Sequence, residues 1–177
     1  SLDEDRLERN FVDLGDGRNP YDITFAPEKP RAFVTNYVRG SVSVVDTDSG
    51  DVVDEIDSDA FQDPQGVAAT KQWLYVTNAN YTGGDPPFGA GSIAIVDRRT
   101  REVVGTARTR WKNPYFARLV DTPRGRRIAV TDMGMVTMSG VPTSPGGLEL
   151  WKPDGEADAD RRSTFELGYD RERGIGA

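Results

Sequence analysis

The chain contains 177 residues, which is enough for one ordinary domain with a sizeable core. It has neither cysteine nor histidine, which excludes disulfide bonds and thiolate chemistry and removes the commonest metal ligand and the commonest general base. Its 29 acidic residues exceed its 22 basic residues for a formal net charge of −7, which argues against a nucleic-acid partner, and no apolar run approaches the ~18 residues that indicate a membrane-spanning helix.

Short β-type runs separated by turn residues dominate the first third of the chain. Residues 1–10 are charged and predict an exposed arm, and residues 10–15 predict one outer strand of a sheet. Four further runs follow between turns rich in proline, glycine and aspartate, at residues 21–26, 32–36, 41–46 and 51–56. A sheet of this size is marginal alone because its edges are open, so these runs predict one unit of a larger stack.

The unit repeats along the chain. The tripeptide Val-Thr-Asn at residues 34–36 returns at 76–78 and, with a carboxylate in place of the amide, as Val-Thr-Asp at 130–132. Upstream of each copy stands Asn-Pro or Asp-Pro, and an alternating apolar run follows each copy. We therefore predict three units, at residues 20–57, 64–109 and 114–170. The strands expected in the second and third units are 66–69, 73–78, 92–97 and 102–106, then 116–120, 127–131, 147–151 and 163–167.

These motifs resemble the YVTN β-propeller repeat. The resemblance rests on Phe-Val-Thr-Asn at residues 33–36, Tyr-Val-Thr-Asn at 75–78, and the Val-Val-Asp and Gly-Asp-Val-Val segments at 44–46 and 50–53. It implies an all-β fold, a β-propeller of four-stranded antiparallel blades, with about three blades present and an arm and outer strand in residues 1–19. Propellers close with roughly four to eight blades, so we expect further blades or other copies to complete the ring.

Candidate binding residues follow from where a propeller places its loops. The loops between second and third strands share a face with the connections between blades, and here these segments are residues 37–40, 79–91 and 133–146 together with 15–19, 57–63 and 108–113. Loops on a rigid scaffold commonly carry binding residues. The candidate contacts are Arg18, Arg39, Tyr81, Phe88, Trp111 and Lys112. The alternative is that the loops only cover the disc.

Two other clusters suggest metal chemistry but have simpler explanations. Residues 46–51 space their oxygen side chains as a calcium loop does, yet the matching residues 97–101 carry basic residues, so ordinary turn chemistry is preferred. Met133, Met135 and Met138 offer soft thioethers, but without cysteine or histidine we interpret them as packing residues. The acidic residues 154–160 are interpreted as a solvated loop. We predict no bound metal and no cofactor.

The sequence contains no nucleophile elbow, phosphate-binding glycine loop or metal-ligand spacing. These absences favour a non-catalytic role, and the resemblance adds that the chain is a propeller segment of a bacterial or archaeal envelope protein; the leading hypothesis is that it binds a protein or glycan through its loop-rich face. The resemblance implies a periplasmic, cell-surface or secreted location. The alternative is part of a propeller enzyme, of the lactonase or the quinone- or haem-assisted dehydrogenase type.

Overall fold

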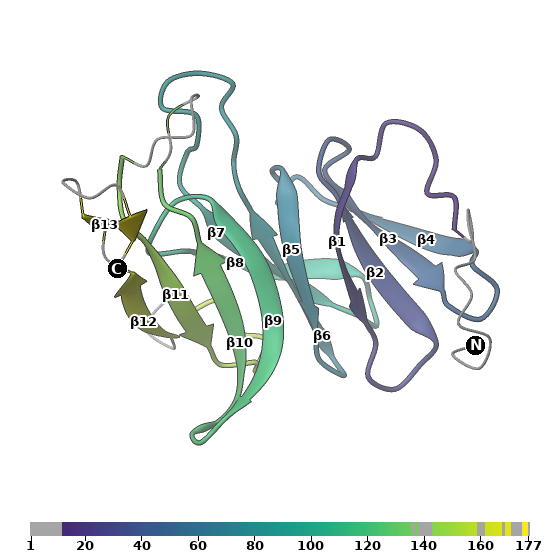
Figure 1. Cartoon of the computed structure of the whole chain (residues 1–177). Coiled ribbons are helices and arrows are strands. Elements are labelled where there is room, and N and C mark those ends of the chain that lie inside the picture. The colour runs from purple at the N-terminus through teal and green to yellow at the C-terminus, as the bar shows by residue number, and fades with distance from the viewer. Residues whose placement is uncertain are drawn as a thin grey trace.

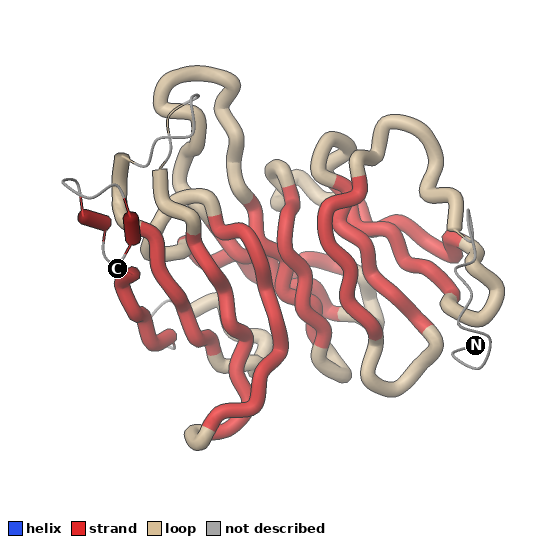
Figure 2. Tube along the Cα trace, in the orientation of Figure 1, coloured by secondary structure: helices blue, strands red, loops and turns tan. Residues whose placement is uncertain are grey.

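A computed structural model describes residues 12–135, 137, 143–158, 162–167, 169–170 and 175–176. All regular elements among these residues are β-strands (Figures 1 and 2). They are β1 (Pro20–Phe25), β2 (Arg31–Asn36), β3 (Ser41–Asp46), β4 (Val52–Asp57), β5 (Pro64–Ala69), β6 (Trp73–Asn78), β7 (Ser92–Asp97), β8 (Glu102–Arg108), β9 (Pro114–Thr122), β10 (Gly125–Asp132), β11 (Gly146–Trp151), β12 (Arg162–Leu167), β13 (Tyr169–Asp170) and β14 (Ile175–Gly176).

The first twelve strands form three four-stranded sheets, in the orders β1-β2-β3-β4, β5-β6-β7-β8 and β9-β10-β11-β12. All neighbouring strands are antiparallel. The three sheets stand side by side with β5 between β1 and β9 (Figure 1). This arrangement confirms the predicted blades, here called blade one, blade two and blade three, and their strands begin and end within two residues of the predicted bounds.

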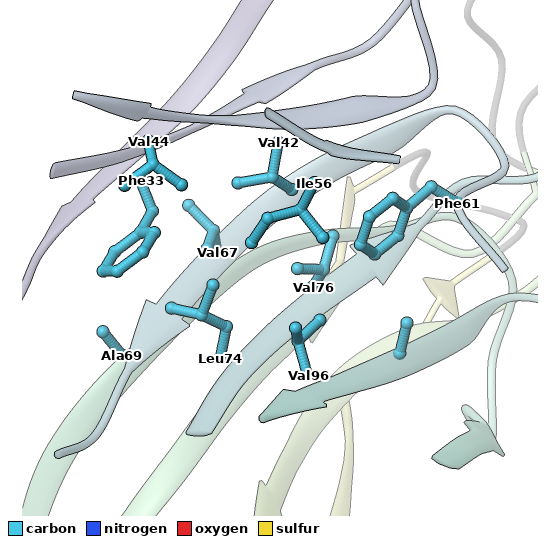
Figure 3. Packing of buried hydrophobic residues seen from close by; sticks show 11 residues of the cluster. Phe33, Val42, Val44, Ile56, Phe61, Val67, Ala69, Leu74, Val76 and Val96 are labelled. Atoms are coloured by element: carbon cyan, nitrogen blue, oxygen red, sulfur yellow. The ribbon is translucent and has the colours of Figure 1, made fainter. Parts of the chain in front are cut away.

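Two apolar layers hold the blades together. The first lies between blades one and two, where Phe33, Val44 and Ile56 face Leu74 and Val76 (Figure 3). The second lies between blades two and three, and its larger members are Tyr75, Ile93, Ile95, Ile128, Val130 and Trp151. Alternate residues of a strand point to opposite faces, so blade two contributes to both layers. Each fully buried side chain of this size contributes about 1.5–3 kcal/mol.

The threonine of the Val-Thr-Asn repeat forms a hydrogen bond between blades. The Oγ1 atom of Thr35 accepts from the backbone N–H of Asp22 at 3.0 Å and donates to the backbone oxygen of Gln65, in the next blade, at 2.5 Å. Thr77 Oγ1 accepts from Gly66 N–H at 2.7 Å and lies 3.4 Å from the backbone oxygen of Tyr115. At each junction one threonine hydroxyl therefore contacts two inner strands, the one in its own blade and the one in the next blade.

The asparagine of the same repeat braces its own blade. Asn36 Nδ2 donates to Ser41 Oγ and Ser43 Oγ, both at 2.9 Å, and Asn78 Nδ2 donates to Ser92 Oγ at 3.1 Å. Both asparagines are 0% exposed, and a buried amide needs such partners because an unsatisfied polar group destabilises the fold. The threonine of the repeated tripeptide thus bonds across the junction between blades, and the asparagine bonds to serine side chains within its own blade.

The N-terminal outer strand that the sequence predicts is not found at residues 12–15, while residues 10 and 11 lie outside the described residues. The Oδ1 atom of Asp13 accepts from the backbone N–H of Gly15 at 2.8 Å, and Gly15 has a φ of +85°. This local turn competes with ladder pairing. Val12 and Leu14 instead pack beside an apolar cluster on the outer face of blade one, formed by Ala32, Val34 and Val45.

Replacement of the blade-two threonine, Thr77→Val, should lower the free energy of unfolding by about 1–2 kcal/mol, because a buried N–H loses its acceptor while the side-chain volume stays nearly constant. Chemical denaturation measures the change. The matched control is Thr106→Val in β8, where Thr106 is exposed. Equal losses in the two variants would show that the bond between blades does not contribute.

Candidate binding face

The predicted loop-rich face is formed by a backbone pattern that repeats in each blade. Tyr37 N–H donates to the oxygen of Asn19 at 3.0 Å, Ala79 N–H to Asp63 at 3.1 Å, and Met133 N–H to Asn113 at 3.0 Å. Each bond joins the start of a loop between second and third strands to the connection that enters the blade. These segments therefore lie together at one end of the sheets, the upper end in Figure 1.

The residues that enter each blade have an unusual backbone conformation. Asn19, Asp63 and Asn113 have φ values of 50°, 54° and 54°, and each precedes the proline that begins an inner strand. Asparagine and aspartate tolerate this left-handed region better than most residues. Proline then fixes φ for the first strand position. The sequence Asn-Pro or Asp-Pro consequently sets the direction in which each inner strand leaves the loop-rich face.

Three of the six sequence-predicted contacts lie together on this face. Tyr81 and Phe88 pack edge to face with ring centroids 5.7 Å apart, and a β-bridge joins them. The ammonium group of Lys112 donates to the backbone oxygen of Phe88 at 3.2 Å. Asp63 Oδ2 accepts from Tyr81 N–H at 2.7 Å, which ties the long loop to the blade. Tyr81 is 40% exposed, so an aromatic surface remains available to a partner.

Trp111, a fourth predicted contact, is buried at 8% exposure. Its six-membered ring covers Gly147 of β11 so closely that a Cβ atom at that glycine would lie 2.3 Å from the ring. The guanidinium group of Arg110 lies over the ring at 5.3 Å. The large apolar area of tryptophan is therefore used for packing under the loops, and this placement makes Trp111 a support of the face.

Arg18 and Arg39 form a separate cluster at the edge of blade one. Arg18 donates to a carboxylate oxygen of Glu55 in β4, and Arg39 Nε lies 3.8 Å from the same oxygen. Ser41 Oγ also donates to Glu55 at 2.5 Å. The hydrogen bond from Arg18 is the main cause that lowers the pKa of Glu55. Arg18 is committed to this ion pair, whereas Arg39 remains 55% exposed.

A group of tyrosines that the sequence reasoning did not single out lies on the same face, and we call Tyr21, Tyr37 and Tyr115 the tyrosine group. The rings of Tyr21 and Tyr37 stack at 5.5 Å, and Tyr115 meets Tyr21 edge-on at 5.4 Å. Tyr21 and Tyr115 occupy the same repeat position, directly after the Asn-Pro pair. That shared position was the available signal, but it served only to align the repeats.

The hydroxyl groups of Tyr21 and Tyr37 stay protonated at neutral pH. Burial raises the pKa of Tyr21 above the ordinary value for tyrosine, with a further contribution from its hydrogen bond with Tyr115. Burial also raises the pKa of Tyr37, and the neighbouring Asp63 and Tyr81 add to the effect. Tyr37 is therefore near enough to Tyr81 for the two phenols to interact electrostatically. A protonated phenol can donate as well as accept a hydrogen bond, which suits recognition of polar partners.

A salt bridge below this face connects the inner strands of all three blades. Arg118 of β9 donates from both terminal nitrogens to the carboxylate of Asp22 of β1, at 2.6 and 2.9 Å. The same carboxylate accepts from the backbone N–H of Val67 of β5 at 3.0 Å. The pair is bidentate and Asp22 is only 8% exposed, which gives it a more defined geometry than a single-bonded surface pair, while the Arg118 side chain is 52% exposed and screened by solvent. It fixes the spacing of the strands that carry Tyr21 and Tyr115.

Blade three replaces the neutral brace of the other blades by two buried carboxyl groups. Asp132 stands where blades one and two have Asn36 and Asn78, and Glu149 stands at the position of Ser43. Asp132 is 4% exposed and Glu149 0%. Burial, together with the nearby Glu149, raises the pKa of Asp132 to about 9. Burial also raises the pKa of Glu149, so the pair retains a proton at neutral pH.

The metal hypotheses for the turns receive structural explanations. Asp46 Oδ1 accepts from the N–H groups of Asp48 and Ser49 at 2.9 and 3.2 Å. Asp97 Oδ1 makes the same two bonds, at 2.7 and 3.2 Å, in the basic turn of blade two. Turn chemistry therefore accounts for both aspartates. Met138 and residues 159–160 lie outside the described residues. Within the described part of the chain, no group of three or more histidine, cysteine, aspartate or glutamate side chains could hold a metal ion.

Comparisons with known proteins support the fold. The sequence matches no protein-family model, and no curated protein matches it. The structure is similar to hydrazine synthase of Kuenenia stuttgartiensis, with a TM-score of 0.50 and 17% identity over 92% of this chain and 53% of that chain. It is also similar to the β-propeller domain of Cps50 (Swd1) from Myceliophteria thermophila, with a TM-score of 0.51 and 11% identity over 89% of this chain and 41% of that chain.

These likenesses, together with the three stacked blades, define the chain as a β-propeller protein. The chain spans about half the length of the solved structures that it matches. At identities of 17% and 11% the likeness shows the fold alone. In the described part of the chain, no helix is long and apolar enough to cross a membrane.

The acid pair of blade three should make stability depend on pH in a direction opposite to that of most carboxylates. The folded-state pKa of Asp132 is about 9, above the value of about 3.9 for an unfolded aspartate. The folded state therefore binds the extra proton, and stability is lost as the pH rises from about 4 toward about 9.

Asp132→Asn should reduce this loss of stability with rising pH. Asparagine stays neutral and can donate to Glu149 as Asn36 donates to Ser43 in blade one. Thermal midpoints measured at about pH 5, 7 and 9 should fall less in the variant than in the original chain. Asp121→Asn is the control, since the Asp121 side chain is 81% exposed. Parallel pH curves for the original chain and Asp132→Asn would contradict the shared proton.

Proposed function

We propose that this chain is a non-catalytic binding segment that holds a protein or glycan partner on its loop-rich face. One observation carries the proposal: the tyrosine group, Tyr81 and Phe88 present five aromatic rings on a single face, with Lys112 beside them. Tyrosine is enriched where proteins bind partners, because it offers a large apolar area and a polar tip at low entropy cost.

The support beneath the rings favours binding over mere coverage of the disc. Tyr21 and Tyr115 stand on inner strands whose spacing the Asp22–Arg118 salt bridge fixes. The long loop carrying Tyr81 and Phe88 is held by Asp63 and by Lys112. A face that is ordered before the partner arrives loses less entropy on binding. Pre-organised aromatic groups of this kind are typical of the few residues that dominate binding energy.

A protein partner is favoured over a glycan by charge. The chain carries a formal net charge of −7, and such a field accelerates association with a basic surface. Protonated tyrosine hydroxyls can then bind backbone carbonyl groups or side-chain carboxylates of that partner. A sugar ring can stack on the same aromatic surface, so the glycan remains the second possibility and is distinguished by the experiment below.

The YVTN-type family and the envelope location belong to the same proposal. Support comes from the repeated Val-Thr-Asn tripeptide, whose threonine and asparagine have distinct structural tasks in blades one and two. A chain of this family would act in the periplasm, on the cell surface or after secretion. The enzyme alternative, of lactonase or dehydrogenase type, has the proton-bearing Asp132 as its best candidate acid, but Asp132 and Glu149 are both buried and do not reach a substrate as placed.

Binding should depend on the rings of Tyr81, which is exposed, and Phe88, which is half-buried, and not on blade stability. With the purified chain as probe on an array of envelope glycans and on immobilised envelope proteins, Tyr81→Ala and Phe88→Ala should weaken a binding signal by about 30-fold, the loss expected for a residue that dominates an interface. The thermal midpoint should stay close to that of the original chain for Tyr81→Ala, because Tyr81 is 40% exposed. A binding signal on the glycan array without one on the proteins would identify a glycan as the partner.

Two variants serve as controls in this assay. Arg126→Ala changes a side chain that is 61% exposed in the hairpin at the opposite end of blade three, so it should leave binding intact. Trp111→Ala should lower the free energy of unfolding by about 3–5 kcal/mol, because it removes a buried ring. If Tyr81→Ala and Phe88→Ala bind as well as Arg126→Ala does, the loop-rich face is not the binding surface.

A further inference from the structure

The two blade-to-blade junctions inside this chain show which residue types a further junction of the same kind would bury. On the face that blade one turns toward blade two, Thr35, Val42 and Ile56 stand opposite one another on three strands. Blade two presents the row Thr77, Ile93 and Ala107 to blade three. All six side chains are 5% exposed or less. A row of threonine, a branched apolar residue and a second apolar residue is therefore buried at each junction.

Blade three carries the same row, and no blade among the described residues covers it. Register places Thr131 opposite Leu148 and Leu148 opposite Phe165. Thr131 is exposed, Leu148 is half-buried, and Phe165 is 51% exposed. Phe116, which stands opposite Thr131, is 42% exposed. We call the row of Thr131, Leu148 and Phe165 the blade-three face. Its residue types are those of a buried junction, but its exposure is that of a free surface.

Blade one has the complementary surface on its other side. In blades two and three the inner-strand residues Val67 and Ala117 are 0% exposed, because the preceding blade covers them. Their counterpart in blade one, Ile23, is 48% exposed, and the neighbouring Phe25 is 62% exposed. A groove of about 560 Å³ lies here, and Val12, Leu14, Ile23, Phe25 and Val34 are among its lining residues. We call this surface the blade-one face.

We propose that a second copy of this chain docks its blade-three face into the blade-one face of the first copy. The two internal junctions supply the argument, since they show a face of the first kind seated on a face of the second kind. Phe165 of one copy would enter the groove beside Ile23 and Phe25 of the other. Thr131 Oγ1 would donate to the backbone oxygen of Tyr21, the counterpart of the acceptors Gln65 and Tyr115.

Each copy carries both the blade-three face and the blade-one face, so two copies can join at two junctions. Contacts between two different surfaces form a closed ring when the rotation per copy closes. Two copies of three blades give six blades, which lies within the range of roughly four to eight at which propellers close. Both junctions then form at once, and the second is strengthened because it is intramolecular. Burial of the exposed phenylalanines and Ile23 provides the driving force.

Light scattering coupled to size-exclusion chromatography, with analytical ultracentrifugation over a concentration series, tests the proposal on the 177-residue chain. The expected mass is twice 19.5 kDa. Phe165→Asp and Phe25→Asp each damage both junctions of the ring, and each should raise the dissociation constant by at least about a hundredfold. Thr131→Val should raise it by about tenfold, because only the hydroxyl is lost. Circular dichroism should show unchanged folding, since all three side chains are exposed in the single chain.

A mixing experiment distinguishes this pairing of unlike faces from any other dimer. Phe165→Asp copies keep an intact blade-one face, and Phe25→Asp copies keep an intact blade-three face. A mixture should therefore form heterodimers through one intact junction, whereas each variant alone should stay monomeric. The control is Val104→Asp on β8, where Val104 is 50% exposed and lies on neither face; it should dimerise normally. A monomeric original chain at every concentration, or dimers that Phe165→Asp and Phe25→Asp leave unchanged, would overturn the proposal.

Discussion

The hydrogen bond from the repeat threonine to the inner strand of the next blade is the contact on which the rest of the structure depends. It requires inner strands that lie very close together. A Cβ atom at Gly66 would lie 2.5 Å from the backbone nitrogen of Ala117, so only glycine fits where β5 passes β9. Thr35 and Thr77 can then reach the next blade with a short side chain. The apolar layers fill the space that this spacing leaves between the outer strands.

A rigid set of inner strands also determines the chemistry of the loop-rich face. Tyr21 and Tyr115 are the second residues of β1 and β9, the inner strands on either side of β5, and the spacing of these three strands brings their rings to 5.4 Å. The Asp22–Arg118 pair preserves that spacing directly below them. Tyr81, Phe88 and Lys112 reach the same region from loops that are bound to the blade entrances. The inner strands therefore directly support the face that we propose binds a partner.

Blade three departs from the repeat in a way that has physical consequences. Asparagine satisfies a buried position without charge, whereas Asp132 must retain a proton to remain beside Glu149. Its threonine is exposed while the other two are fully buried. Blade three is thus similar to the others in backbone and different in both contacts that define the repeat. Carboxyl groups on a surface would remain ionised, and these two differ because Asp132 and Glu149 are buried inside blade three.

The sequence by itself determined the strands, the blades and the face on which the loops gather, because the period-two pattern, the turn residues and the repeated tripeptide are all local signals. It also placed Tyr81, Phe88 and Lys112 among the candidate contacts, because they lie on one loop and one connection of that face. Only the tertiary structure decided that Trp111 is a packing residue, that Arg18 is bound to Glu55, and that Tyr21, Tyr37 and Tyr115 meet. Those facts depend on contacts between residues far apart in the chain, and a local pattern carries no information about which distant side chain lies within reach.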